Sequence, residues 1–170
     1  MKCPTCRQAE IEILREARPA DRFLPDVIAD GLTHGTCPHC GETMTGFPRP
    51  LEMFALVTRA ILAKGWRLAP SEVRYLRSVL AMKGEALAET LGVTATQLSR
   101  WENGAAKGAR TVQISPTADR LLRVLVANAR GIDAPALRGI DGSHSEPLRL
   151  RLELGKRWRV VETAGKALVG

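Results

Sequence analysis

The sequence predicts an α+β protein, in which a small N-terminal β domain is followed by an all-α domain and a short C-terminal β extension. Three observations indicate this order. Two Cys-x-x-Cys pairs bracket the first 40 residues, the stretch Lys83–Gly104 has the pattern of two short helices joined by a tight turn, and residues 148–154 alternate strictly between leucine and a charged residue. A chain of 170 residues is long enough for two small domains.

The two cysteine pairs predict a metal site. They are separated by 30 residues and consist of Cys3, Cys6, Cys37 and Cys40. A two-residue spacer lets both sulfurs of a turn face one ion, and two such turns supply four thiolates for a tetrahedral Zn²⁺ site. We therefore expect a zinc-ribbon domain over residues 1–48 with one structural Zn²⁺ per chain. An iron site with the same ligands and two disulfides are the alternatives, and a reducing compartment disfavours the disulfides.

The segment between the cysteine pairs offers strand-forming material. Ile11 and Ile13 alternate with charged residues, and residues 23–28 form a second short apolar segment. Residues 49–70 then connect the two halves of the chain. Their apolar positions repeat at helical spacing, which predicts a linker helix that ends near Gly65.

The stretch Lys83–Gly104 is typical of a helix-turn-helix, in which the second helix enters the major groove of DNA. A small residue at Ala88 allows close helix contact, Gly92 can adopt the positive φ of the turn, and Leu98 anchors the second helix in the core. Thr94 precedes the second helix and can cap it through its hydroxyl. Further helical patterns lie on both sides, and they extend the predicted domain to residues 71–131. This domain resembles the Xre/Cro-like DNA-binding domains through Leu76-Arg77, Leu87-Ala88, Leu91-Gly92-Val93 and the run Leu98–Gly104.

The residues of the second helix divide into an inner and an outer face. If Leu98 and Trp101 point inward, Thr96, Gln97 and Arg100 lie outside and are the candidate base-reading residues. A surface ion pair with a helix neighbour is the alternative role for Arg100. The candidate phosphate contacts lie at the start of the first helix and after the second helix, and they are Lys83, Gly84, Lys107 and Arg110.

The charge of the chain supports a polyanionic partner. The net charge is +7, and residues 1–66 carry eight basic and eight acidic residues, so the whole excess lies in residues 67–170. We expect double-stranded DNA with a palindromic operator as the partner of a homodimer. The N-terminus has no apolar signal-peptide core and no apolar run is long enough to cross a bilayer, so we expect a cytoplasmic protein without a membrane partner.

Residues 132–170 form an extension with a predicted β-hairpin. Leu148, Leu150, Leu152 and Leu154 define a strand with one apolar face, and Trp158–Glu162 is a second strand after a turn at Gly155. A two-stranded ribbon is marginal alone, so the hairpin must pack on something. Dimerisation, contact with DNA and a lid over the helices are the three arrangements that the sequence leaves open.

A cysteine-paired ribbon followed by an Xre-like domain resembles the MqsA (YgiT-type) antitoxin family. Cys3, Cys6, Cys37 and Cys40 match the zinc ligands of that family in type, order and spacing. The resemblance covers residues 1–130 and implies an N-terminal domain that holds a toxin and a C-terminal domain that dimerises and represses its operon. In that family an Asn and an Arg four residues apart read the bases; Arg100 matches the Arg, but Thr96 replaces the Asn.

The predicted function is therefore that of a sequence-specific transcriptional repressor, acting as the antitoxin of a type II toxin–antitoxin system. A zinc-binding regulator without a toxin is one alternative, and an interaction module whose helix-turn-helix does not bind DNA is another. The sequence does not predict an enzyme. Once the four cysteines are assigned to a metal, no arrangement typical of nucleophilic or acid–base catalysis remains, and the chain has three histidines.

Overall fold

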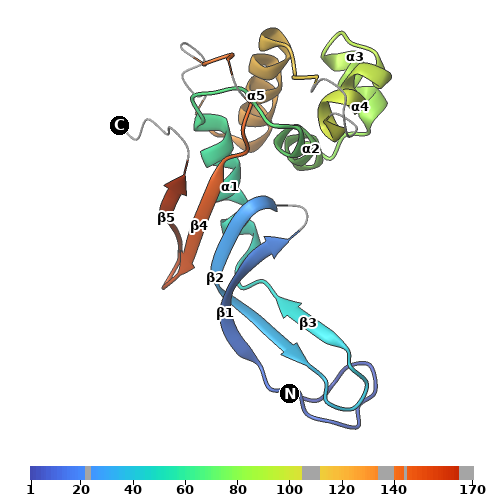
Figure 1. Ribbon diagram of the computed structural model, residues 1–170, viewed down its shortest axis with the longest axis vertical. Coiled ribbons are helices and arrows are strands. Elements are labelled where there is room, and N and C mark those ends of the chain that lie inside the picture. The colour runs from blue at the N-terminus through green and yellow to red at the C-terminus, as the bar shows by residue number, and fades with distance from the viewer. Residues whose placement is uncertain (22–23, 105–111, 134–139, 144, 165–170) are drawn as a thin grey trace. The chain divides into compact units, whose positions relative to one another are not determined.

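The computed structural model describes residues 1–21, 24–104, 112–133, 140–143 and 145–164. The fold is mixed α+β and forms two compact units, one built from Met1–Leu56 with Leu150–Glu162 and the other from Val57–Arg149. The elements, in chain order, are β1 (Leu14–Asp21), β2 (Leu24–Thr36), β3 (Thr43–Gly46), α1 (Pro50–Ala63), α2 (Pro70–Val79), α3 (Gly84–Thr90), α4 (Ala95–Asn103), α5 (Pro116–Arg130), β4 (Arg149–Leu154) and β5 (Trp158–Ala164) (Figure 1).

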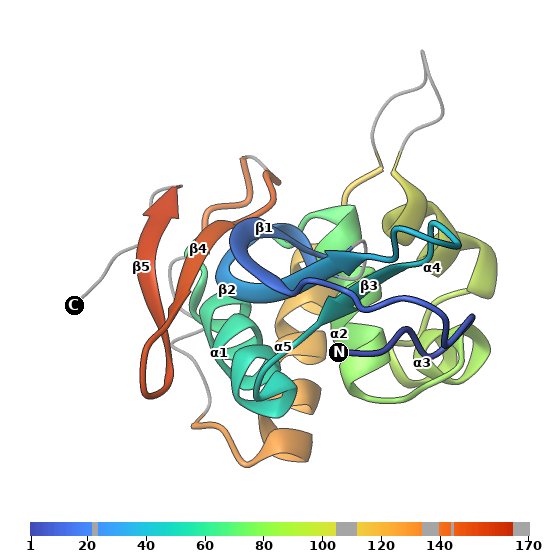
Figure 2. The ribbon, with the colours of Figure 1, turned by 90° about the horizontal axis from the view of Figure 1, so that it is seen from below.

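The first unit is a five-stranded sheet arranged around β2 (Figure 2). Strand β1 pairs antiparallel along one edge of β2. Two strands share the other edge: β3 pairs antiparallel with Thr33–Thr36, and β4 pairs parallel with Val27–Asp30. Strand β5 lies outside β4. The sheet therefore joins residues from the beginning and from the end of the chain.

The sequence left open what the C-terminal hairpin packs on, and in the structure it belongs to the sheet of the first unit. Gly31 allows its close approach, because a Cβ atom there would lie 2.7 Å from the Cβ of Leu154 and the φ of Gly31 is +113°. The indole N–H of Trp158 also donates to the carbonyl of Pro48 at 2.7 Å. Local periodicity predicts each strand, but it contains no information on a pairing between residues more than 100 positions apart.

We expect Gly31→Ala to destabilise the protein by about 1–3 kcal/mol, because the substitution combines a strained backbone conformation with a clash against β4. Chemical denaturation followed by circular dichroism measures this change. Gly155→Ala is the matched control within the hairpin, since its Cβ would meet only the Arg157 carbonyl oxygen at 3.9 Å. Equal stability of the two variants would contradict the proposed role of Gly31.

The first strand begins later than the sequence predicted. The segment around Ile11 was expected to be a strand, but β1 starts at Leu14. Ile11 instead packs against Cys3 and Cys37 with 2% of its surface exposed, and it exchanges backbone hydrogen bonds with Met1. The apolar side chain is used at the cysteine cluster, which the alternating pattern alone could not indicate.

The second unit packs its helices around a mainly aliphatic core that also contains the aromatic side chains of Trp66, Tyr75 and Trp101. Helix α2 contacts α4 and α5, and α3 contacts α4. Its fully buried side chains include Leu68, Leu76, Leu87, Leu98, Trp101, Leu122 and Val126. In the described part of the chain, every helix is too short or too polar to cross a lipid bilayer.

Arg123 on α5 binds backbone carbonyls at the end of helix α1. Its guanidinium is fully buried, pairs with Asp119 at 2.6 Å and donates to the carbonyls of Ile61, Leu62, Lys64 and Trp66. The last carbonyls of a helix have no partner within the helix. Helix α1 ends at Ala63, close to the Gly65 that the sequence indicated. A cation distant in sequence binds carbonyls of its last turn and of the segment that follows.

Glu72 is a second buried charge that joins three segments. Its carboxylate accepts hydrogen bonds from the Lys64 ammonium, from the Ala69 N–H at 2.7 Å and from the Leu148 N–H at 2.8 Å. Burial lowers the pKa of Lys64, and the charge of Glu72 opposes this shift. The pair is almost completely shielded from solvent, with exposed side-chain fractions of 0% and 2%.

We expect Glu72→Gln to lower the free energy of unfolding by about 3–5 kcal/mol, because it leaves the Lys64 ammonium buried without its counter-charge. Urea denaturation at neutral pH measures the loss. Glu89→Gln, on the exposed surface of α3, is the control and should change stability by less than about 0.5 kcal/mol. A loss for Glu72→Gln as small as that of the control would refute the role assigned to this carboxylate.

Candidate metal centre and nucleic-acid surface

Two turns of the same conformation present the four cysteines. In the first turn the N–H of Arg7 donates to the carbonyl of Cys3, and in the second the N–H of Gly41 donates to Cys37, both at 3.0 Å. Arg7 and Gly41 each lie four residues after the first cysteine of their pair, and both have positive φ, 58° and 74°. Positive φ is ordinary for glycine but costly for arginine. The repeated turn therefore gives both cysteine pairs the same local backbone geometry.

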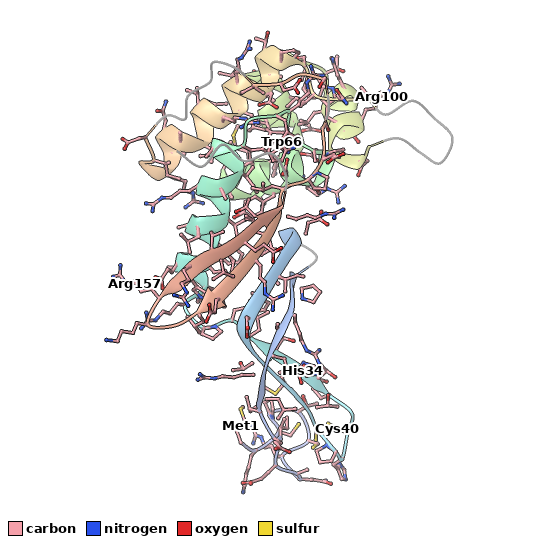
Figure 3. All side chains as sticks on the ribbon, turned by 60° about the vertical axis from the view of Figure 1, so that its left-hand side comes forward. Met1, His34, Cys40, Trp66, Arg100 and Arg157 are labelled. Carbon is pink, nitrogen blue, oxygen red and sulfur yellow. The ribbon has the colours of Figure 1, made fainter. Side chains whose placement is uncertain are left out.

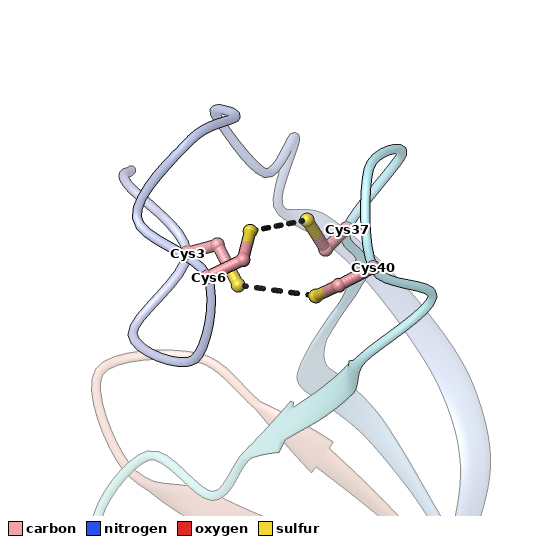
Figure 4. Close-up of side chains that lie close together, drawn as sticks. All are labelled: Cys3, Cys6, Cys37 and Cys40. Atoms are coloured by element: carbon pink, nitrogen blue, oxygen red, sulfur yellow. Dashed lines mark hydrogen bonds between the residues drawn. The ribbon is translucent and has the colours of Figure 1, made fainter.

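The four sulfur atoms form one compact cluster (Figure 4). All of them lie within 4.8 Å of one another, with 3.7 Å between the sulfurs of Cys3 and Cys40 and 3.6 Å between those of Cys6 and Cys37. A tetrahedron with metal–sulfur bonds of about 2.3 Å has sulfur–sulfur edges of about 3.8 Å. All four cysteines are free thiols rather than disulfides. The cluster can hold one metal ion, as the spacing predicted.

The cluster is closed on one side and open on the other. Cys3 and Cys37 are buried, whereas Cys6 is half-buried and Cys40 is exposed. His34 on β2 and Cys40 both lie at the cysteine end of the first unit (Figure 3). The Nδ1 atom of His34 is buried without a hydrogen-bond partner among the described residues. Four sulfurs complete a tetrahedral shell without a histidine.

The protonation of the cluster is uneven. A hydrogen bond from the Cys6 backbone lowers the pKa of Cys3 to about 6. At Cys40 a hydrogen bond from the Glu42 backbone lowers the pKa, but desolvation and the hydrogen bonds with the other thiols outweigh it and raise the pKa to about 12. At neutral pH Cys3 is therefore mainly a thiolate and Cys40 mainly a thiol. Metal binding must displace at least the Cys40 proton, because the ligand is the thiolate.

We expect the apparent affinity for Co²⁺, a spectroscopic probe of tetrahedral thiolate sites, to fall as the pH is lowered. The loss should be about tenfold per pH unit for each proton displaced, and it should steepen near the pKa of Cys3. Titrations followed by the visible absorption of the cobalt complex between about pH 8 and about pH 5 measure this dependence. Cys6→Ser should remove the four-thiolate spectrum. An affinity independent of pH would contradict the assigned protonation states.

In the second unit a tight turn joins α3 to α4. Gly92 has a φ of +68°, and the N–H of Val93 donates to the carbonyl of Ala88 at 2.9 Å. Such a positive-φ residue and backward hydrogen bond end a helix at low cost when the residue is glycine. Helix α4 then begins with Thr94 as its N-cap, whose hydroxyl accepts from the Gln97 N–H at 3.2 Å. Both features agree with the expectation from the sequence.

Helix α4 has one buried and one exposed face. Leu98 and Trp101 are 1% and 2% exposed. The candidate base-reading residues Thr96, Gln97 and Arg100 are all exposed, and the Arg100 side chain extends from the helix (Figure 3). In the described part of the chain Arg100 forms no ion pair, so the alternative role, pairing with a helix neighbour, is not seen there.

Two arginines of α2 hold the end of α4, and the sequence analysis missed both. Arg77 forms a bidentate pair with the carboxylate of Glu102, with donor–acceptor distances of 2.6 and 3.0 Å. This interaction raises the pKa of Arg77. Arg74 donates to the Glu102 carbonyl at 3.0 Å and to the Asn103 side chain at 2.6 Å. Arg77 lies in the segment that carries the resemblance to Xre-like domains, but its partner is 25 residues away.

The candidate phosphate contacts are only partly described. Lys83 is the exposed N-cap residue of α3, and Gly84 is the first residue of that helix. Both line a surface hollow between the start of α3 and α4. Lys107 and Arg110, the other two candidates, lie outside the described residues. The structure thus brings two of the four candidates next to the helix that carries the base-reading candidates.

Comparison with known proteins does not identify the function of these sites. No protein-family model, curated protein or solved structure matches this chain.

Proposed function

We propose that this protein is a sequence-specific, DNA-binding transcriptional repressor in which α3 and α4 form a helix-turn-helix. The observation that carries the proposal is the exposed face of α4, where a guanidinium, an amide and a hydroxyl project side by side from a helix whose other face is buried. Arg can bind the O6 and N7 atoms of guanine, and Gln can bind adenine. The hydrogen bonds from Arg74 and Arg77 to the end of α4 support the proposal, because base reading requires a rigidly held helix.

The basic charge of the chain supports the same function. Val57–Arg149 contains 14 Lys and Arg residues against eight Asp and Glu residues. A positive surface attracts duplex DNA and releases its counterions, which makes the binding sensitive to salt. The protein acts as a homodimer on a palindrome whose half-sites are about one helical turn apart.

The four-cysteine cluster holds a structural Zn²⁺ ion in this proposal. A four-sulfur shell has no open position for water or substrate, so the ion stabilises the first unit rather than catalysing a reaction. The sulfur–sulfur distances and the free thiols support a metal, and zinc is the ion that such ligands hold most often in structural sites. Elemental analysis of the purified protein should find one zinc per chain.

The biological role that we propose is that of the antitoxin in a type II toxin–antitoxin system. The support is the order of a cysteine-paired ribbon and an Xre-like domain, which resembles the MqsA family. Such a protein binds its toxin and represses its own operon. Co-expression with the protein encoded by the neighbouring reading frame tests this step, and absence of a complex leaves a zinc-binding regulator without a toxin.

We expect Arg100→Ala to weaken binding to the upstream region of its own gene by about 1–3 kcal/mol and to relax the preference at one base pair. By contrast, Lys83→Ala should weaken binding to all sequences equally and lower the salt slope by about one, because it removes a phosphate contact. Fluorescence anisotropy with operator and random duplexes measures both effects.

The matched control for Arg100→Ala is Arg59→Ala, which removes an exposed arginine from α1. It should leave the ratio of specific to random binding unchanged. If wild type and Arg100→Ala both bind operator and random DNA with equal affinity, the repressor function is refuted.

A further inference from the structure

Strand β5 has an open outer edge. Among the described residues its only neighbouring strand is β4, so one side of its backbone has no strand partner in the sheet. Such an edge presents a row of N–H and C=O groups that can pair with another chain. Proteins commonly protect edge strands with proline, with short length or with inward-pointing charge. Strand β5 is seven residues long and contains no proline.

The exposed surface of β5 is partly apolar. Val160 and Val161 are 38% and 46% exposed. Because they are adjacent in a strand, their side chains lie on opposite faces, and both faces of β5 therefore expose an apolar side chain. The flanking Arg159 is turned toward β4, where it pairs with Glu153 at 2.8 Å. This pairing neutralises one of the two charges that flank the valines, and the other, Glu162, is exposed.

A surface hollow lies where β5 begins. Arg157, the residue before β5, lines it together with the residues at the start of α1, from Arg49 to Glu52. Leu51 is 83% exposed there, which is unusual for a leucine. Glu52 is shared between Arg49 and Arg157 at 3.8 Å each, so two cations face one carboxylate. Arg157 projects into solvent at this end of the hairpin (Figure 3).

The charge of the first unit is concentrated on this hairpin. Leu150–Glu162 contains four basic and two acidic residues, whereas Met1–Leu56 contains six basic and eight acidic residues. The basic residues of the hairpin are exposed. Strand β5 itself carries one basic and one acidic residue, so the positive charge next to the open edge lies where β5 begins, at Lys156 and Arg157.

We propose that the outer edge of β5 binds an extended acidic segment of a partner protein by strand addition. The backbone of that segment pairs with β5, one apolar side chain covers Leu51 in the hollow, and carboxylates contact Arg157 and Arg49. In this binding mode the main-chain hydrogen bonds supply affinity, and the side chains at every second position of the added strand supply specificity. The proposal does not depend on the DNA-binding function or on the metal.

Two other occupants fit the surface less well. Duplex DNA would satisfy the arginines, but its phosphates would leave the valines, Leu51 and the strand edge uncovered. A second copy of the hairpin would cover the edge, but it would bring a second set of basic residues against this surface. Both are distinguishable outcomes of the test.

The probe is a display library of random ten-residue peptides, selected on the full-length protein. We expect the selected sequences to be rich in Asp and Glu at alternate positions, to carry at least one large apolar residue and to lack proline. A synthetic peptide of the enriched sequence should slow amide hydrogen exchange in residues 158–162 and leave exchange in β1 unchanged.

Arg157→Glu should weaken binding of that peptide by about tenfold, because it replaces an attraction by a repulsion. Arg15→Glu makes the same charge change on β1, at the opposite edge of the sheet, and should have little effect. Leu51→Ser should also weaken binding, and the exposure of Leu51 means that it should not affect folding.

Three results would overturn the proposal. In the first, the library yields no peptide that protects β5 from amide hydrogen exchange, or its peptides bind Arg157→Glu as tightly as they bind the wild-type protein. Protection of β5 rises with protein concentration alone, which assigns the edge to a second copy. Arg157→Glu weakens binding to random duplex DNA, which assigns the basic hairpin to nucleic acid.

Discussion

The buried carboxylate of Glu72 is the constraint on which the helical unit depends. It accepts one hydrogen bond from the side chain that follows α1, one from the residue before α2 and one from Leu148, just before β4. An uncompensated charge in a protein interior is very costly, so these three segments must meet at one point. Arg123 acts in the same way at the end of α1, where four carbonyls converge on its guanidinium. Two buried charges thus lie where α1 ends and where α2 begins.

The first unit relies on a different constraint, because its apolar core is small. The four sulfurs lie together only when the two cysteine turns adopt matching conformations, and Arg7 accepts a positive φ to achieve this. A metal ion at such a cluster links the N-terminal residues to the end of β2 and supplies free energy that a core of this size cannot. In the helical unit the exposed face of α4 has a comparable support, since the ties from α2 to its C-terminal end hold the helix through side chains.

Much of the candidate site could be predicted from local patterns. The spacing of the cysteines predicted their cluster, and the spacing of Leu98 and Trp101 predicted which face of α4 would be exposed. Thr94 was predicted as a cap because a hydroxyl before a helix can accept from its first turn. The partners of Arg77, Glu72 and Arg123 could not be predicted. A charged residue in a helical pattern reads as solvent-exposed unless its partner is known. The partners of Arg77 and Glu72 lie in other elements. Arg123 pairs with a carboxylate of its own helix, but the four carbonyls that it binds lie at and after the end of α1.

The sequence by itself determined the elements and the chemistry: five helices, two of the strands near their observed positions, the metal-ligand set and the polar face of α4. These features depend on spacings of two to four residues, which local stereochemistry translates directly into structure. Only the tertiary structure decided that the C-terminal hairpin joins the N-terminal sheet. That pairing depends on Gly31 lying opposite Leu154 and on the leucines of β4 turning to the buried face beside Val27 and Ala29. A contact across so long a stretch of chain is selected by the packing of the whole sheet, and no short segment contains it.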